Sequence, residues 1–563
     1  MAKRRLTPRS ILASAGITVG IGTVTLGAGR PPNPAPSEPV RIQIDFGRHI
    51  GPINPYIYGM ASAGPEHFRQ LRVPLTRWGG NPSTRYNWVR GNCWNAARDW
   101  HFANGNYGNV DAAALQPSGA ADRAVTTNRR NGSDTLLTIP TLGWVARDDV
   151  QWHVSIGVPA EGGPPLAPGS DAIVGYDPAA NRRRVSVPSK PRKGSRFLDP
   201  PDRNADVVYQ DEWVYHLTRK FGTAAADGVK FYAMDNEPDL WDSTHTDMHP
   251  VQPDYDEILT TFLAYATAVK DVDPNAQITG PVSWGWSGYF FAPRDRGSDR
   301  YGAHADRRRH GNQPFLPWFL SRVAAHDRRT GRRTLDVLDV HFYPQGDGIY
   351  SGRTDEDTNA RRLRSTRGLW DPHYRDESWI DTEIQLIPRL RQWVRRAYPG
   401  TRIGLTEWNW GAERTMNGGL AVAEVLGVLG REQIDMACYW TAPPVRSPAF
   451  LAYKLYRNAD GQGHGFGDQA VPVIGNASDE VSCYAAYDLL ARTPTIMLIN
   501  RSVTRAHQVQ LTMIREGEAH TVNQYRLSAD NPLSIVRLAD IPLEGRPLSV
   551  TLPSTSITLL RGE

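Results

Sequence analysis

The chain has 563 residues, of which 40% are hydrophobic and 22% are charged. A chain of this length and composition can bury a sizeable core and suggests more than one domain, which excludes a disordered tail or a single small module. Residues 1–30 contain five of the 64 basic residues and no acid, and the remaining 59 basic residues equal the 59 acidic ones. The body of the protein is therefore neutral, and we expect no nucleic-acid partner.

The N-terminal segment has the features of an export signal. Residues 1–10 are basic, residues 11–29 are uncharged and apolar or small, and residues 31–39 are rich in proline. This order is typical of a signal peptide or an uncleaved anchor followed by a stiff spacer. We predict a signal or anchor segment at 1–30, a Pro-rich spacer at 31–39, and a protein that is secreted or extracytoplasmic, either free or anchored in the membrane by this segment. No later apolar run is long enough to span a membrane.

Residues 40–58 begin with a strand pattern. Val40, Ile42, Ile44 and Phe46 alternate with polar residues, which is the period of a half-buried strand. Because this stretch precedes the strand–helix units that follow, we expect it to join a β-sandwich formed by the C-terminal residues.

Strand and helix patterns alternate from residue 59 to residue 445. The strand-like runs include Val229–Met234, Ala276–Val282, Leu335–Phe342, Arg402–Thr406 and Ile434–Thr441. Helical patterns lie between them, and one is expected to begin after Asp254 as its cap. Repeated units of this kind predict an α/β fold, the (β/α)8 TIM barrel. Residues 150–210 are rich in Pro, Gly and charge, and we interpret them as an insertion.

The pattern changes after residue 446. Short alternating runs separated by turn residues continue to the C-terminus, for example Thr495–Ile499 and Thr521–Leu527. They predict a C-terminal antiparallel β-sandwich domain at 446–563.

Two glutamates follow predicted strands of the barrel. Glu237 follows the predicted strand at 229–234, and Glu407 comes directly after the predicted strand at 402–406. Catalytic residues of TIM barrels come from the C-terminal ends of strands, so both should lie at one mouth. Two carboxyl groups in such a place can cleave a glycosidic bond, because one protonates the leaving oxygen and the other attacks the anomeric carbon or activates water.

Tryptophan supports a sugar substrate. Seven of the 17 tryptophans lie near predicted strand ends: Trp78, Trp144, Trp284, Trp286, Trp408, Trp410 and Trp440. A sugar ring packs its flat C–H face on such rigid aromatic surfaces, although large aromatic side chains also anchor cores. We assign substrate binding to Trp440, Trp284, Trp286 and Trp410, with Trp440 as the main platform.

Several motifs together resemble those of glycoside hydrolase family 44. They are Arg77–Asn81 (RWGGN), Tyr86–Trp88 (YNW), Tyr232–His249 (YAMDNEPDLWDSTHTDMH), Gly280–Trp286 (GPVSWGW) and Thr406–Asn409 (TEWN). The resemblance extends over nearly all of residues 40–563. It implies an endo-β-1,4-glucanase, of a kind often active on xyloglucan and carboxymethylcellulose, in the clan of retaining (β/α)8 glycosidases.

The resemblance also implies a role for each matching residue. Glu237 would be the acid/base, Glu407 the nucleophile, and Asn236 a partner of the sugar 2-hydroxyl. Tyr343 would orient the nucleophile and Arg77 would contact it from the barrel floor. Trp440 would underlie the reacting sugar. The chain has Trp408-Asn409-Trp410 after the nucleophile, where many relatives have a Tyr, and this difference bears on the shape of the cleft.

The two carboxyl groups need different charge states. Glu407 must be ionised to attack, and we expect Arg77 and Tyr343 to lower its pKa. Glu237 must start protonated, and we expect repulsion from Glu407 to raise its pKa. A retaining pair should have its carboxyl groups about 5–5.5 Å apart.

No cofactor and no catalytic metal are predicted. His245 and His249 are four residues apart, but Pro250 and the polar sequence around them favour a loop over a metal-binding helix. A structural calcium near Asp355–Asp357 is compatible with the sequence. The expected partner is a polysaccharide, and the expected state is a monomer.

Two alternatives remain open at this point. An enzyme of the same clan could act on xylan, mannan or arabinosides, and a decayed barrel could be a surface protein that binds glycans without catalysis. The presence of both Glu237 and Glu407 in their full contexts favours an enzyme.

Overall fold

The computed structural model describes residues 38–95, 99, 102–106, 111–153, 185–297, 301–475, 478–514, 519–543 and 547–563. The predicted export segment and residues 154–184 of the predicted insertion lie outside these ranges. Pro39–Glu563 form one unit. Within the described ranges, none of the helices combines the length and apolar character that crossing a membrane requires.

Eight parallel strands close into a barrel, which confirms the predicted TIM fold. In chain order they are β3 (Gly59–Ala61), β4 (Leu75–Trp78), β7 (Asp134–Ile139), β11 (Phe231–Met234), β12 (Gln277–Ser283), β13 (Val337–Phe342), β14 (Arg402–Trp408) and β15 (Met436–Tyr439). Strands β11 and β13 are buried at every position. This burial follows from the architecture, because helices cover the outside of such a barrel and side chains fill its interior.

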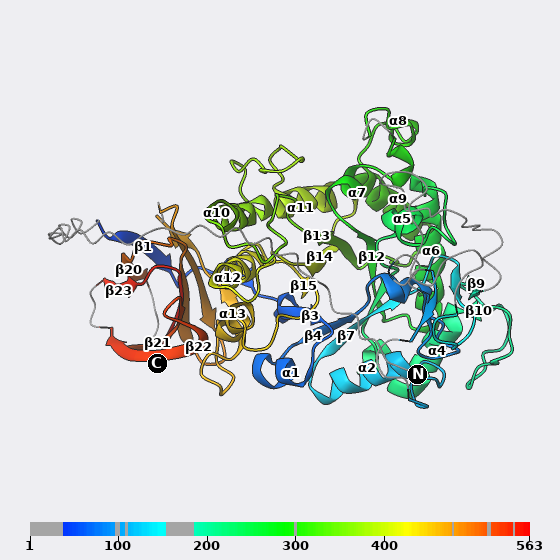
Figure 1. The fold of residues 1–563 in the computed structure, drawn as a ribbon, viewed down its shortest axis with the longest axis horizontal. Helices are drawn as coiled ribbons and strands as arrows, with labels where there is room; N and C mark the ends of the chain where they lie inside the picture. Colours follow the sequence, from blue (N-terminus) through cyan, green and yellow to red (C-terminus); the bar gives the residue numbers. More distant parts are fainter. Residues whose placement is uncertain are drawn as a thin grey trace, which may run out of the picture. The chain divides into compact units, whose positions relative to one another are not determined.

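Helices follow the barrel strands and surround them (Figure 1). The principal ones are α1 (Pro65–Leu71), α2 (Gly119–Arg130), α4 (Gln210–Phe221), α6 (Tyr255–Val272), α9 (Phe315–Thr330), α11 (Leu386–Ala397), α12 (Met416–Arg431) and α13 (Pro448–Arg457). Asp254 caps α6, because its carboxylate accepts a hydrogen bond from the backbone N–H of Glu257 at 2.9 Å. Helix α13 packs against α1 and α12. A barrel helix therefore lies inside the range 446–563 that the sequence pattern assigns to the sandwich.

Two sheets form the β-sandwich. The seven-stranded sheet has the order β2-β16-β18-β19-β24-β21-β22, and the four-stranded sheet has the order β17-β1-β20-β23. Their bounds are β1 (Val40–Asp45), β2 (Gly51–Pro52), β16 (Gln469–Ala470), β17 (Val473–Ile474), β18 (Val481–Asp488), β19 (Thr493–Asn500), β20 (His507–Ile514), β21 (Thr521–Ser528), β22 (Asn531–Pro542), β23 (Leu548–Leu552) and β24 (Ser556–Gly562). Apolar side chains from both sheets share one core.

The first strand of the chain lies among the last ones. Strand β1, blue in Figure 1, lies beside the red and orange C-terminal strands. It pairs with β20 in parallel, with Val40 opposite Val509 and Asp45 opposite Ile514. Among the strand pairs described in the two sheets, this pair is parallel and the others are antiparallel.

Smaller elements complete the chain. Strands β8 (Trp144–Ala146), β9 (Ser186–Lys190) and β10 (Val208–Tyr209) form a three-stranded sheet around the insertion. The others are β5 (Trp94–Asn95), β6 (Asn104–Gly105), α5 (Trp241–Thr244), α7 (Trp286–Phe290), α8 (Ala305–Arg309) and α10 (Glu356–Ser365).

Helix α12 connects the barrel to the sandwich. It contacts α13 on the barrel side and strands β18, β19 and β24 on the sandwich side. The approach is closest at Gly427, where a Cβ atom would lie only 2.4 Å from the ring of Tyr484 on β18. The helix can reach this sheet only because residue 427 has no side chain.

We expect Gly427→Ala to lower the free energy of unfolding by about 1–2 kcal/mol. The overlap with Tyr484 outweighs the gain of about 1 kcal/mol in helix propensity that alanine brings. Urea-induced unfolding measures this change. Gly352→Ala is the control, because a Cβ atom there meets no atom within 4 Å. Equal unfolding midpoints for the two variants would contradict the close approach.

Candidate active site

The turn after β11 presents Glu237 at the mouth of the barrel. Asp235 and Glu237 both have left-handed backbone conformations, with φ values of 71° and 50°. Such conformations are strained for residues other than glycine and concentrate at functional sites. The buried carboxylate of Asp235 holds the turn, because it accepts hydrogen bonds from the hydroxyl of Thr84 at 2.6 Å and from the backbone N–H groups of Thr141 and Leu142. The position of Glu237 is thus fixed by a network beneath it.

Glu407, near the end of β14, is held by two donors. The Arg77 Nη1 donates to Glu407 Oε1 at 2.5 Å, and the Tyr343 hydroxyl donates to Glu407 Oε2 at 2.8 Å. Arg77 also donates through Nη2 to Asn236 Oδ1 at 2.7 Å. A buried guanidinium therefore links the nucleophile candidate on β14 to the turn that carries Glu237.

The two glutamates face each other across a histidine. A carboxylate oxygen of Glu237 and one of Glu407 lie within 4.8 Å of each other. The Nδ1 atom of His341 lies 2.8 Å from Glu237 Oε1 and 3.4 Å from Glu407 Oε2. Our sequence analysis did not select His341. It stands two residues before Tyr343, and side chains two apart along a strand share a face, so this spacing is a signal that could have revealed it.

Burial favours the protonated form of Glu237, the form that can give a proton. Removal from water raises the pKa of Glu237 to about 7; the Arg77 charge opposes this rise, and the Asp99 charge adds to it. The expected cause, repulsion from Glu407, is therefore corrected: desolvation is the largest contribution. Burial also lowers the pKa of His341 to about 4, so this histidine is neutral near pH 7. Burial, followed by the Glu407 charge, raises the pKa of Tyr343, which keeps its hydroxyl protonated as a donor.

Glu237, His341 and Glu407 also have the spacing of metal ligands. Within the described ranges, they are the one group of three or more His, Cys, Asp or Glu side chains whose ligand atoms lie within 4.8 Å of one another. Arg77 already pairs with Glu407, so a cation there would meet a fixed positive charge. The Arg77 guanidinium therefore disfavours a metal ion at this place.

The predicted calcium position is occupied by a helix cap. Asp355 precedes α10, and its carboxylate accepts a hydrogen bond from the backbone N–H of Thr358 at 3.0 Å. It also pairs with Arg353 at 3.2 Å. Calcium binding near Asp355–Asp357 stays a prediction.

Trp440 lies next to Arg77, the partner of Glu407. It follows β15 and is partly exposed. The guanidinium of Arg77 lies 5.7 Å from the centre of its ring. A Cβ atom at Gly80 would lie 2.4 Å from the same ring, so glycine is needed there to admit the indole. The indole is therefore in place to underlie a sugar that reaches Glu407.

A cavity of about 740 Å³ extends from Trp440 past Tyr343. Tyr350 also lines it; this side chain is 54% exposed and stands edge-on to the ring of Tyr343 at 5.6 Å. Our sequence analysis did not select Tyr350, because it lies in a loop with no strand pattern around it. The groove thus has aromatic surfaces on which sugar rings can pack.

The structure corrects the assignment of Trp410. Its side chain is fully buried, its indole N–H donates to the Ser365 hydroxyl at 3.0 Å, and it packs against Phe342 and Trp408. A buried core residue cannot contact the substrate. The strand-end position was correct, but the side chain points into the packing around the barrel.

Trp284 and Trp286 are both partly exposed. The backbone N–H of Trp284 donates to the Asp239 carboxylate at 3.1 Å. Trp286 packs against Phe290, and the guanidinium of Arg389 lies 5.4 Å from its ring. Substrate binding by these two residues stays a prediction.

Comparisons with known proteins agree with this geometry. A model of glycoside hydrolase family 44 matches residues 93–346. Endoglucanase A of Paenibacillus lautus is 31% identical over 496 residues, which cover 85% of this chain and 65% of that protein. The chain therefore spans less than two thirds of the length of this curated relative.

Two solved structures match over nearly their whole length. CelM2, a bifunctional glucanase-xylanase protein from a metagenome library, is 36% identical, with a TM-score of 0.84 over 93% of this chain and 99% of that one. A Paenibacillus polymyxa xyloglucanase from family 44, solved with xyloglucan, is 29% identical, with a TM-score of 0.81 over the same shares. With this fold and these motifs, the chain belongs to glycoside hydrolase family 44.

Proposed function

We propose that the protein is an exported, retaining endo-β-1,4-glucanase that hydrolyses internal bonds of plant-type β-glucans such as xyloglucan. The observation that carries this proposal is the pair Glu237 and Glu407, whose nearest oxygens lie within 4.8 Å of each other. Tyr343, which donates to Glu407, also lines the aromatic cavity. Retaining pairs lie about 5–5.5 Å apart, whereas inverting pairs lie about 6.5–9.5 Å apart to leave room for a water molecule. The short separation favours double displacement.

In the first step Glu407 attacks the anomeric carbon. Arg77 and Tyr343 both donate to its carboxylate and hold it in one orientation. Glu237 gives its proton to the leaving oxygen, which a group with a pKa near 7 can do at neutral pH. Asn236, fixed by Arg77, offers its amide to the sugar 2-hydroxyl.

In the second step water releases the sugar from Glu407. Once Glu407 is esterified its negative charge is gone, so Glu237 can lose its proton and act as the base toward water. Neutral His341 lies between the two groups and contacts Glu237 at 2.8 Å in this geometry. The mechanism uses side chains alone.

The choice of substrate is supported by the relatives and by the groove. One similar structure is a xyloglucanase solved with xyloglucan, and Tyr350 and Trp440 line a cavity in which sugar rings can pack on aromatic surfaces. CelM2, at 36% identity, is a bifunctional glucanase-xylanase protein, which makes xylan the second candidate. The proposal of export rests on the pattern of residues 1–39, and the proposal of a polysaccharide partner rests on the family.

Hydrolysis should release the β-anomer first. Double displacement inverts the anomeric carbon twice, so ¹H NMR spectra of the first minutes of xyloglucan cleavage should show β-reducing ends before mutarotation. Glu407→Ala should release no reducing sugar from xyloglucan or xylan. Early appearance of the α-anomer would rule out the retaining mechanism.

Glu237→Gln should separate substrates by leaving group. An activated aryl glycoside needs little protonation, so its first step should be nearly unchanged, while kcat/KM on xyloglucan should fall by about 10²–10⁴-fold. Burst kinetics with the aryl glycoside measures the first step. Equal losses on both substrates would show that Glu237 is not the acid.

The activity of the wild type should fall as the pH rises above about 7. Glu237 must hold a proton in the free enzyme, and its pKa of about 7 sets the basic limb of kcat/KM. Asp99→Asn removes a negative charge that raises this pKa, so the limb should move to lower pH. A basic limb that stays in place in this variant, or moves upward, would contradict the assignment.

A further inference from the structure

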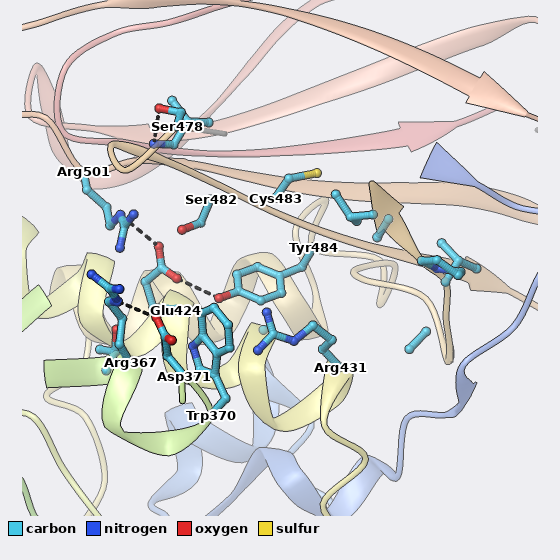
Figure 2. A pocket seen from close by; sticks show the side chains of 18 of the residues that line it. Arg367, Trp370, Asp371, Glu424, Arg431, Ser478, Ser482, Cys483, Tyr484 and Arg501 are labelled. Atoms are coloured by element: carbon cyan, nitrogen blue, oxygen red, sulfur yellow. Dashed lines mark hydrogen bonds and ion pairs between the residues drawn. The ribbon is translucent and has the colours of Figure 1, made fainter. Parts of the chain in front are cut away.

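A second cavity, of about 680 Å³, lies where helix α12 faces strand β18, and no residue of the active site lines it (Figure 2). Its walls come from α12, from β18, from the segment around Trp370 and from Arg501 after β19. Its volume falls within the range of about 300–1,000 Å³ that is typical of small-molecule sites.

The central acidic group of this cavity is Glu424, and one of its two carboxylate oxygens accepts no hydrogen bond from the described part of the chain. Glu424 is only 3% exposed, and its Oε2 accepts a hydrogen bond from the Tyr484 hydroxyl at 2.7 Å. Its Oε1 is buried and has no hydrogen-bond partner among the described residues; the Arg501 Nε lies 3.7 Å away. Figure 2 shows the carboxylate directed toward Tyr484 and Arg501. A buried carboxylate oxygen without a donor is costly, which indicates a missing hydrogen-bond donor at this place.

Two guanidinium groups of the same wall each have one nitrogen that donates no hydrogen bond to any described residue. Arg431 Nη2 and Arg501 Nε are buried and, within the described ranges, have no hydrogen-bond acceptor. The Arg431 guanidinium is held in place, because it lies 4.2 Å from the centre of the Trp370 ring and its Nε donates to Glu432 at 3.0 Å. The wall therefore offers unused donors as well as an unused acceptor.

The charges of the described residues that line the cavity leave no excess of positive charge, and the acidic Asp479 lines it as well. Each arginine in its wall has a carboxylate partner: Arg364 with Glu377, Arg367 with Asp371, Arg431 with Glu432 and Arg501 with Glu424. The wall thus has no excess positive charge to attract an anion. Its complement is a neutral compound that both donates and accepts hydrogen bonds, and hydroxyl groups do both.

We propose that this cavity binds a neutral sugar of one or two rings. Its hydroxyl groups donate to Glu424 and accept from Arg431 and Arg501, and its C–H face packs toward the partly exposed Trp370. The need for a neutral hydroxylated ligand follows from the cavity alone. The choice of a sugar among such compounds rests on the proposed function.

Calorimetric titration with cellobiose tests the proposal in the Glu407→Ala background, which leaves the ligand intact. We expect two sites per chain, one in the active-site groove and one in the cavity. Adding Arg431→Met, or separately Glu424→Gln, should weaken the second site by about ten- to hundredfold, because each removes a charged hydrogen-bonding group. With Glu407 present, Arg431→Met should hydrolyse xyloglucan at the wild-type rate, which also shows that this variant folds.

Arg333→Met is the matched control, because the Arg333 guanidinium also lies 4.2 Å from an aromatic ring, that of Tyr398, but outside the cavity. It should leave both sites intact. A single site that neither Arg431→Met nor Glu424→Gln affects would overturn the cavity proposal, and so would displacement of cellobiose from the second site by inorganic phosphate. The proposed function is judged separately, by hydrolysis with Glu407 present.

Discussion

The arrangement of the active site depends on one buried cation. Arg77, on β4, is almost completely shielded from water and donates to both Glu407 on β14 and Asn236 after β11. Leaving this guanidinium unpaired at such a depth would cost several kcal/mol, so each partner adds to the stability of the fold. The same contacts that satisfy Arg77 therefore orient Glu407, the proposed nucleophile, and connect three strands of the barrel.

The two glutamates acquire different roles from their surroundings. Glu407 accepts hydrogen bonds from Arg77 and Tyr343, which hold its carboxylate in one orientation. Glu237 has His341 as its neighbour and is buried without a cation of its own, and its pKa rises to about 7. The neutrality of His341 matters here, because a protonated imidazole between the two carboxylates would stabilise the ionised form of Glu237 and lower its pKa. Burial of this histidine is thus part of the acid/base design.

Helix α12 couples the catalytic barrel to the sandwich. It follows β14, the strand that ends near Glu407, and its far face meets β18 at Gly427. The same helix carries Glu424 and Arg431, which line the cavity between the two parts. At Gly427 the helix has no side chain and packs closely on β18. At Glu424 and Arg431 it has charged side chains, and these line the polar cavity next to the close contact. The sandwich is in this way more than an appended domain, since it forms half of a second site.

The sequence by itself determined the barrel, the sandwich and the positions of Glu237 and Glu407 at strand ends, because hydrophobic periodicity and strand order report local geometry. It could not determine what covers a side chain. Trp410 and Trp440 both follow barrel strands, yet Trp410 is sealed in the core while Trp440 faces Arg77 in the groove. His341 and the parallel pairing of β1 with β20 likewise arise from contacts between segments far apart in the chain. Only the tertiary structure decided these features, because burial, and with it the pKa of Glu237, is a property of the neighbours that folding brings together.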